Sequence, residues 1–289
     1  MGFWLELAAS GLITGGIYAV VAIGLNLQYG LMRIMNISHG EFLMLGAYLT
    51  WLAYTVLGIN PLASLLPVAV ALFLLGLIVY ALCFRRIART APSVEVIEAR
   101  SLLVGFGLMF LVQNAAYLAW GADLRGYSFL AEPVEIAGAR FMSNRLVVFA
   151  FAVGLSLVML AVLRWTLIGK AVRAMMQSPA GAQLVGIDTT VLHPVVFGAG
   201  LALAGVAGGL LSMVYEISPS MGEPYTVTAL IVITLGGLGS ALGSLLGGFI
   251  LGLVEAFGMH FTSPSLKMLL SYAVLIGVLL ARPRGLFSR

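Results

Sequence analysis

The stretch that decides the fold runs over 33 residues from Thr226 to Gly258 and reads TVTALIVITLGGLGSALGSLLGGFILGLVEAFG. Glu255 is its single charged residue. A helix crosses a bilayer with about 20 apolar residues, so this stretch is too long for one untilted span. The glycines at 236–239 predict a bend. We therefore expect either two short helices or a re-entrant hairpin, which is tolerated at that depth only where protein or a water cavity covers it.

Seven further apolar stretches predict membrane spans on both sides of this one. They are residues 7–30, 39–57, 62–83, 101–120, 146–163, 194–215 and 266–281. The chain is 61% apolar and 9% charged, whereas soluble proteins are about 45–50% apolar and about 25% charged. We expect an all-α, polytopic transmembrane protein with about 8–9 membrane segments. It forms one domain over residues 1–289, with no internal repeat visible in the sequence.

The charges predict the orientation of these spans. Lys and Arg gather in segments 84–100 and 164–193 and in the tail from Arg282 to Arg289. With Arg33, eleven of the fifteen basic residues then share one side. Positive segments stay in the cytoplasm, so the N-terminus is predicted outside and the C-terminus inside. The net charge of +4 arises from these segments and not from a basic face, which argues against nucleic-acid binding.

Glycines spaced four residues apart lie on one face of a helix and let two helix backbones approach closely. Such pairs occur at 11 and 15, 205 and 209, and 248 and 252. The long stretch contributes a larger set that serves either helix packing or a hinge, namely Gly236, Gly237, Gly239, Gly243 and Gly247.

The cytoplasmic segment 164–193 is predicted to contain a short helix. Ser178 before Pro179 is a typical N-cap with proline at the first helical position. Gly186 stands where a C-terminal glycine belongs, so the helix covers about residues 179–185. Such a helix between two spans is either a docking element or a surface loop lying on the membrane. Lys170 and Arg173 share a face of the preceding turn.

Polar residues inside membrane spans are candidates for function. The densest group is Asn36, Ser38, His39 and Glu41. Ser38 and Glu41 have the spacing of a capping box, so this group either starts a helix or lines a substrate path. Gln113 and Asn114 are further candidates, either for the substrate path or for hydrogen bonds between helices. Asn26 and Gln28 are candidates for hydrogen bonds between helices. Glu255 is predicted either near the outer interface or paired inside the protein.

The sequence indicates no catalytic set and no metal site. The three histidines are far apart, a single cysteine excludes an internal disulfide, and no Cys/His ligand spacing occurs. The nucleotide-binding loop requires Gly-x-x-x-x-Gly-Lys-Ser/Thr. Gly169-Lys170 is followed by Ala171, and Arg164 stands in place of the first glycine. We therefore expect no ATP to bind by that route.

Four stretches resemble the LivH family, the permease subunits of branched-chain amino-acid ABC importers. The first is Gly169-Lys-Ala-Val-Arg173-Ala with Gly186-Ile187-Asp188, which is similar to the coupling loop of such permeases. The others run over residues 29–48, 236–248 and 282–287. The coupling loop of the family carries acidic residues around positions 178 and 180, and here Ser178 and Ala180 replace them.

The resemblance implies a permease that works with partners in the bacterial inner membrane. These partners are a second, related permease, two cytoplasmic ATPase subunits that bind ATP and magnesium, and an external substrate-binding protein. The chain itself would need no cofactor and would not be an enzyme. Glu216 and Glu223, in an outer loop, suit contact with the binding protein or are simply solvated. The residues implied to couple to the ATPase are Gly169, Lys170, Arg173, Ala174, Ser178, Pro179, Ala182, Leu184, Gly186 and Ile187.

Three alternatives remain open from the sequence. A related importer could carry short amides or urea, because few fixed charges line the spans. A stand-alone secondary transporter or channel would instead have coupling-ion sites at the midplane and often inverted repeats, and neither is visible in the sequence. A purely structural membrane scaffold would not need the capped cytoplasmic helix.

Overall fold

The computed structural model describes residues 2–136, 138–282 and 285–287. Pro283, Arg284 and Arg289, which belong to the predicted tail, lie outside the described residues. The elements, in chain order, are α1 (Gly2–Met32), α2 (His39–Thr55), α3 (Pro61–Val79), a π-helical turn (Tyr80–Phe84), α4 (Arg85–Thr90), α5 (Val94–Trp120), β1 (Pro133–Ile136), β2 (Ala139–Met142), α6 (Ser143–Trp165), α7 (Leu167–Gln177), α8 (Pro179–Leu184), α9 (Thr189–Ser212), α10 (Gly222–Gly236), α11 (Ala241–Phe261), a 3-10 turn (Pro264–Leu266) and α12 (Lys267–Ala281).

Six helices within the described residues are long and apolar enough to cross a membrane. They are α1, α5, α6, α9, α11 and the continuous run Pro61–Thr90 formed by α3, the π-helical turn and α4. The chain is therefore an α-helical polytopic membrane protein, as predicted. Helices α2, α10 and α12, with 17, 15 and 15 residues, are shorter.

The long apolar stretch breaks where its glycines predict. Helix α10 ends at Gly236 and α11 begins at Ala241, with Ser240 as its N-cap. Gly237 and Gly239 have φ angles of +99° and +85°, which an L side chain rarely adopts. Gly236 and Gly243 face each other so closely that a Cβ on either would overlap the backbone of the other helix. The stretch thus forms two helices joined by a tight corner.

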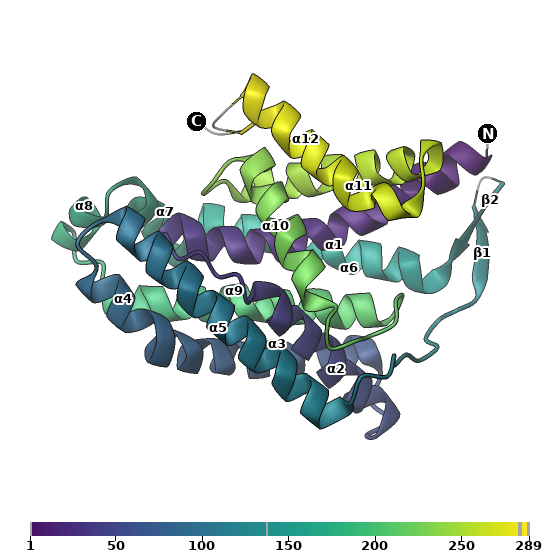
Figure 1. The fold of residues 1–289 in the computed structure, drawn as a ribbon, viewed down its shortest axis with the longest axis horizontal. Coiled ribbons are helices and arrows are strands. Elements are labelled where there is room, and N and C mark those ends of the chain that lie inside the picture. Colours follow the sequence, from purple (N-terminus) through teal and green to yellow (C-terminus); the bar gives the residue numbers. More distant parts are fainter. Residues whose placement is uncertain (1, 137, 283–284, 288–289) are drawn as a thin grey trace.

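Two sets of three helices pack in the same order with opposite direction (Figure 1). Helix α1 contacts α11, and α9 contacts α3 in the same way. Helices α1 and α9 touch each other, as do the two short helices α2 and α10. The pairs α1 and α9, α2 and α10, and α3 and α11 each run in opposite directions (Figure 1). An inverted arrangement that the sequence does not reveal is therefore present in the packing.

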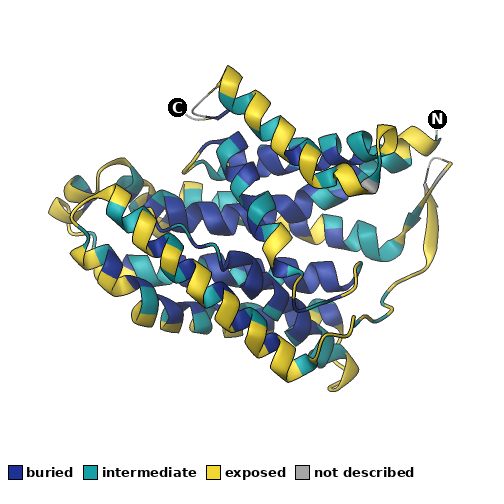
Figure 2. Cartoon of the chain, viewed as in Figure 1, coloured by how far each residue is buried: buried dark blue, intermediate teal, exposed yellow. Residues whose placement is uncertain are grey.

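The core lies along α1 and α9, whereas α5, α6 and α12 are largely exposed (Figure 2). Glycines bring α1 and α11 together, because a Cβ at Gly15 would come within 2.7 Å of the Gly248 carbonyl oxygen. Gly252 packs against Gly11 and Gly15 in the same seam. These glycine pairs serve packing, one of the two roles proposed for the spacing of four.

A two-stranded antiparallel hairpin, β1 with β2, interrupts the all-α pattern between α5 and α6. It was not predicted from the sequence, because residues 121–145 carry charges of both signs and each strand has only four residues. The hairpin lies near the start of α1, at the opposite end of the molecule from α4, α7 and α8 (Figure 1).

Candidate functional site

The first candidate site lies where α2 begins, near the middle of the molecule. Helix α1 ends at Met32, and Arg33 follows with a φ of +56°. The irregular segment 33–38 then returns the chain into the interior. Four polar residues there are at most 1% exposed, namely Asn36, Ser38, His39 and Glu41.

Hydrogen bonds tie the first two of these residues to neighbouring helices. Ser38 Oγ donates to Asn36 Oδ1 at 2.6 Å, and Asn36 Nδ2 donates to Gln28 Oε1 at 3.1 Å. Gln28 Nε2 in turn donates to the Phe197 carbonyl oxygen at 3.1 Å. This chain of bonds links α1, α2 and α9, and it confirms the prediction that Gln28 bonds a neighbouring helix.

The predicted capping box is wrong. Ser38 is the N-cap of α2, but its side chain makes no capping hydrogen bond, because the Glu41 N–H donates to the Ser38 carbonyl oxygen at 3.0 Å and not to the hydroxyl. The Glu41 carboxylate does not accept from the Ser38 N–H as a capping box requires. Neither of its oxygens has a hydrogen-bond partner among the described residues. A carboxylate buried without a partner is costly, so the capping explanation for Glu41 fails.

Helix α10 covers this site from the other half of the molecule. The Gly40 N–H donates to Thr226 Oγ1 at 2.7 Å. A Cβ at Gly40 would overlap the Gly222 carbonyl, and a Cβ at Gly222 would come within 2.9 Å of Glu41 Cδ. Two helix N-termini therefore meet at one buried point, with an unpartnered carboxylate between them. His39 Nε2 lies 3.2 Å from the Val21 carbonyl oxygen.

Gln113 and Asn114 do not join this cluster. Both lie on α5, where Gln113 is half-buried and Asn114 is exposed. Asn114 Nδ2 donates to the Phe110 carbonyl oxygen of its own helix at 2.7 Å. The prediction that Asn114 bonds a neighbouring helix is therefore wrong, because an exposed amide satisfies itself within its own turn.

Asn26 holds the corner between α10 and α11. Its Nδ2 donates to the Ser240 carbonyl oxygen at 3.0 Å and to Ser244 Oγ at 2.7 Å. Its Oδ1 accepts from the Gly239 N–H at 2.6 Å. The predicted bond to a neighbouring helix is confirmed. Gly247 packs nearby against Val232 and Leu235 of α10.

Glu255 is paired inside the protein, which decides between the two predicted environments. Tyr18 Oη donates to Glu255 Oε2 at 2.7 Å, and Ser271 Oγ donates to Oε1 at 2.5 Å. Lys267 Nζ lies 3.4 Å from Oε2. These contacts join α1, α11 and α12. Tyr18, Lys267 and Ser271 were not predicted as partners of Glu255, because no local sequence pattern connects residues in different helices.

The second candidate site is the segment between α6 and α9. The short helix predicted over about 179–185 is present as α8, Pro179–Leu184. Ser178 Oγ accepts from the Gly181 N–H at 3.1 Å, and Gly186 has a φ of +87°. Leu184 is 88% exposed and Val185 is 77% exposed. A capped helix thus presents two bare apolar side chains.

Helix α7 precedes it and was not predicted. Thr166 Oγ1 caps it by accepting from the Gly169 N–H at 3.1 Å. Gly169, Val172 and Met175 are its buried residues, and their spacing of three is the signal that could have found the helix. A Cβ at Gly169 would overlap the end of α6, so the glycine permits the sharp turn between the two helices.

The predicted coupling residues divide between the surface and the interior. Gly169 and Ala182 are buried, and Ala174 and Ile187 are half-buried. The exposed members are Lys170, Arg173, Ser178, Pro179, Leu184 and Gly186. The exposed set is available to a partner, whereas the buried set fixes α7 and α8 against the membrane helices.

Long apolar helices around a buried polar centre define a polytopic membrane protein with the construction of a transporter. The chain matches, over residues 7–279, the family described as the permease component of the branched-chain amino acid transport system. The chain belongs to this family, whose members are transport permease components. It is a multi-pass protein of the inner membrane.

Individual relatives match over nearly the whole chain. The high-affinity branched-chain amino acid transport system permease protein BraD of Pseudomonas aeruginosa is 30% identical over 295 residues, which cover 99% of this chain and 96% of BraD. LivH of Escherichia coli K12 is 30% identical over 300 residues, with the same two coverages. LivM of Salmonella typhimurium is 26% identical over 306 residues, covering 93% of this chain and 67% of LivM. No solved structure matches the chain.

Proposed function

We propose that the chain is the membrane-spanning permease subunit of an ATP-driven importer that moves branched-chain or similar small amino acids into the cell. The observation that carries this proposal is the family match over residues 7–279. The inverted packing of α1–α3 and α9–α11 is also found in secondary transporters, so that feature does not separate the two classes. The names of BraD and LivH favour branched-chain amino acids over short amides or urea.

The proposed topology has nine membrane segments, with the N-terminus outside and the C-terminus in the cytoplasm. The three short helices α2, α10 and α12 complete the six long ones, and α2 and α10 each cross together with the irregular segment before them. Support comes from the basic residues, since α4, α7 and α8 lie at one end of the molecule (Figure 1). Positive segments stay in the cytoplasm.

The importer is proposed to contain four kinds of subunit. The likeness to LivM as well as LivH supports a second, related permease beside this chain. Two cytoplasmic ATPase subunits bind ATP and magnesium, and an external protein delivers the substrate. This chain is a single permease domain over residues 1–289 and needs no cofactor of its own.

Helices α7 and α8 are proposed to couple the ATPase to the path. Leu184 and Val185 on α8 provide the apolar contact, and Lys170 provides charge beside it. When ATP closes the ATPase pair, α8 moves with it and the permease pair changes from inward-facing to outward-facing. Hydrolysis resets the pair.

The substrate path is proposed to pass the point where α2 and α10 meet. In the described state this point is closed by the contact of Gly40 with Gly222. Separation of the two helices would uncover Glu41 together with both helix N-termini. An amino acid carries an ammonium group for the carboxylate and a carboxylate for a helix N-terminus.

Two experiments test this proposal. The first purifies the chain from its native membrane in mild detergent and identifies what accompanies it. ATPase subunits and a second permease are the expected partners. If the chain instead purifies alone and transports in ATP-free proteoliposomes, it is a secondary transporter.

The second experiment places a charge on α8. Leu184→Glu should lower ATP-driven transport and transport-stimulated ATPase activity about tenfold or more, because it introduces an unpaired charge into an apolar contact. Leu124→Glu is the matched control, since Leu124 is 65% exposed in the loop near the hairpin. Gly186→Trp should also uncouple, because its φ of +87° strains any side chain. Normal coupling in both Leu184→Glu and Gly186→Trp would refute the docking role.

A further inference from the structure

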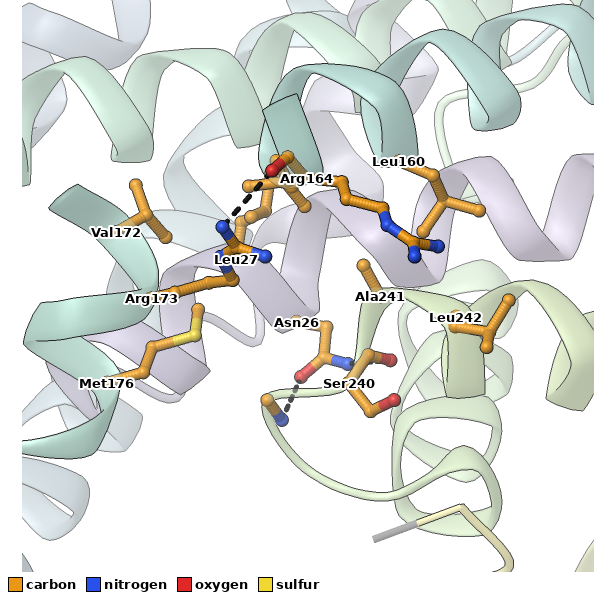
Figure 3. A pocket seen from close by; sticks show the side chains of 12 residues that line it. Asn26, Leu27, Leu160, Arg164, Val172, Arg173, Met176, Ser240, Ala241 and Leu242 are labelled. Atoms are coloured by element: carbon orange, nitrogen blue, oxygen red, sulfur yellow. Dashed lines mark hydrogen bonds between the residues drawn. The ribbon is translucent and has the colours of Figure 1, made fainter. Parts of the chain in front are cut away.

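A basic cavity lies where α6, α7 and α11 meet. Its volume is about 490 Å³. Arg164 at the end of α6 and Arg173 of α7 both border it, and Asn26 and Ser240 lie across from them (Figure 3). No acidic side chain is among the described residues that line the cavity. It therefore carries two uncompensated positive charges, which indicates an anionic ligand.

A hydrogen bond fixes the Arg173 side chain at the border of the cavity. Arg173 Nη2 donates to the Arg164 carbonyl oxygen at 3.1 Å, which fixes its side chain across the end of α6. The first turn of α11, Ala241 and Leu242, forms the facing wall. The N-terminus of this 21-residue helix adds a positive dipole end to the two arginines. Three sources of positive potential thus point into one space.

The other walls of the cavity are apolar and lie beside an exposed part of α6. Leu160 and Leu163 of α6 line it together with Leu27. Helix α6 is the least buried of the six long helices, and Leu157 and Val158 on it are 53% and 58% exposed. Acyl chains lying along α6 would bring a headgroup to Arg164. A soluble anion would gain nothing from these leucines.

We propose that this cavity binds the phosphate group of an anionic phospholipid, held by Arg164 and Arg173 at the N-terminus of α11. Basic pockets between membrane helices at the cytoplasmic face bind such headgroups. The side of the membrane rests on the topology proposed above, whereas binding itself does not. A bound lipid would connect α7, part of the proposed coupling region, to the corner that Asn26 holds between α10 and α11.

The test uses the purified importer complex in vesicles of phosphatidylcholine with or without phosphatidylglycerol. Lipid retained after detergent extraction is measured by mass spectrometry. We expect the unaltered complex to enrich phosphatidylglycerol. Arg164→Gln and Arg173→Gln should each reduce this enrichment about fivefold, and the double variant about thirtyfold, given about 1 kcal/mol for each basic residue near the surface.

Three controls keep the outcome decisive. Arg86→Gln removes an exposed cytoplasmic charge outside the cavity and should keep the enrichment. Lys substitutions at 164 and 173 should retain most of it, which separates loss of charge from loss of folding. Added inorganic phosphate should leave the lipid in place.

Several results would overturn the proposal. Equal enrichment in the unaltered complex and the double Gln variant would show that the arginines bind no lipid. Displacement of the lipid by inorganic phosphate would assign the site to a free anion. Enrichment only after the ATPase subunits are removed would show that an acidic side chain of a partner fills the cavity. None of these results depends on whether the importer transports amino acids.

Discussion

Glu41 and Glu255 are both buried carboxylates in membrane helices, yet their surroundings differ completely. Glu255 is 2% exposed and accepts from Tyr18 and Ser271, with Lys267 at 3.4 Å. Glu41 is 0% exposed, and neither of its oxygens has a hydrogen-bond partner among the described residues. One carboxylate is satisfied within the chain, whereas the other is not.

This difference separates a structural role from a functional one. A buried charge with a full set of partners joins helices, since removing it strands those partners. A buried charge without partners destabilises the fold and persists only where another requirement keeps it. Glu255 therefore holds α1, α11 and α12 together, whereas the unpartnered Glu41 carboxylate suits the substrate-binding role proposed for the point where α2 and α10 meet.

Glu255→Ala should produce the largest effect on stability. It leaves the Tyr18 hydroxyl and Ser271 without their acceptor, so the free energy of unfolding should fall by about 3 kcal/mol. The midpoint of thermal unfolding of the purified complex measures this loss. Glu216→Ala, at an exposed position between α9 and α10, is the control. An unchanged unfolding midpoint in Glu255→Ala would show that Glu255 does not hold the three helices together.

Tyr18→Phe should have the next largest effect. The ring stays packed while one hydrogen bond to a charged group is lost, at about 2 kcal/mol. Tyr54→Phe provides a comparison, because the Tyr54 hydroxyl makes only a 3.3 Å bond to the Ser128 carbonyl oxygen in an exposed setting. Equal unfolding midpoints in the two variants would mean that Glu255 does not depend on Tyr18.

Glu41→Gln should not lower stability, because the carboxylate has no hydrogen-bond partner to lose, and it should reduce transport. The amide keeps the size of the side chain but loses the charge for an ammonium group, so leucine uptake should fall about tenfold. Uptake into proteoliposomes with internal ATP measures this, and unfolding of the same sample checks the fold. Full uptake in the variant would exclude Glu41 from substrate binding. A large loss of stability would show that Glu41 instead stabilises the fold.

Lys267→Met should have the smallest effect, about 0.5 kcal/mol of stability. The Lys267 side chain is 40% exposed, so solvent screens its attraction to Glu255. Tyr18 and Ser271 remain to satisfy the carboxylate. If this variant were as unstable as Glu255→Ala, the ion pair and not the hydroxyls would hold the three helices.

The helices and the break in the long stretch could be predicted because their signals are local. The stretch 39–57 corresponds to α2, His39–Thr55, since its apolar length sets its bounds. The glycines between Gly236 and Gly243 predicted the corner between α10 and α11. Ser178 and Pro179 predicted the start of α8 in the same way.

Partners distant in sequence could not be predicted. Tyr18 and Glu255 are 237 positions apart, and nothing near either residue indicates the other. The capping box failed for a local reason, because the Glu41 N–H bonds the carbonyl oxygen of Ser38 and not its hydroxyl. The direct contact of Gly40 with Gly222, which places Glu41 between two helices, follows only from how the two halves pack.

The joint between α8 and α9 is short and hydrogen-bonded throughout. The Gly186 N–H donates to the Gln183 carbonyl oxygen and the Ile187 N–H to that of Ala182, both at 3.0 Å. Asp188 Oδ1 accepts from the Thr190 hydroxyl and N–H, both at 2.7 Å, and these hydrogen bonds hold the pKa of Asp188 below its usual range. These hydrogen bonds make the connection between α8 and α9 rigid. Helix α9 in turn packs directly on α2. In the proposed importer this joint lies between the ATPase contact and the substrate path, and because linkage is reciprocal, amino acid binding would change the affinity for ATP by the same factor as ATP changes the affinity for amino acid.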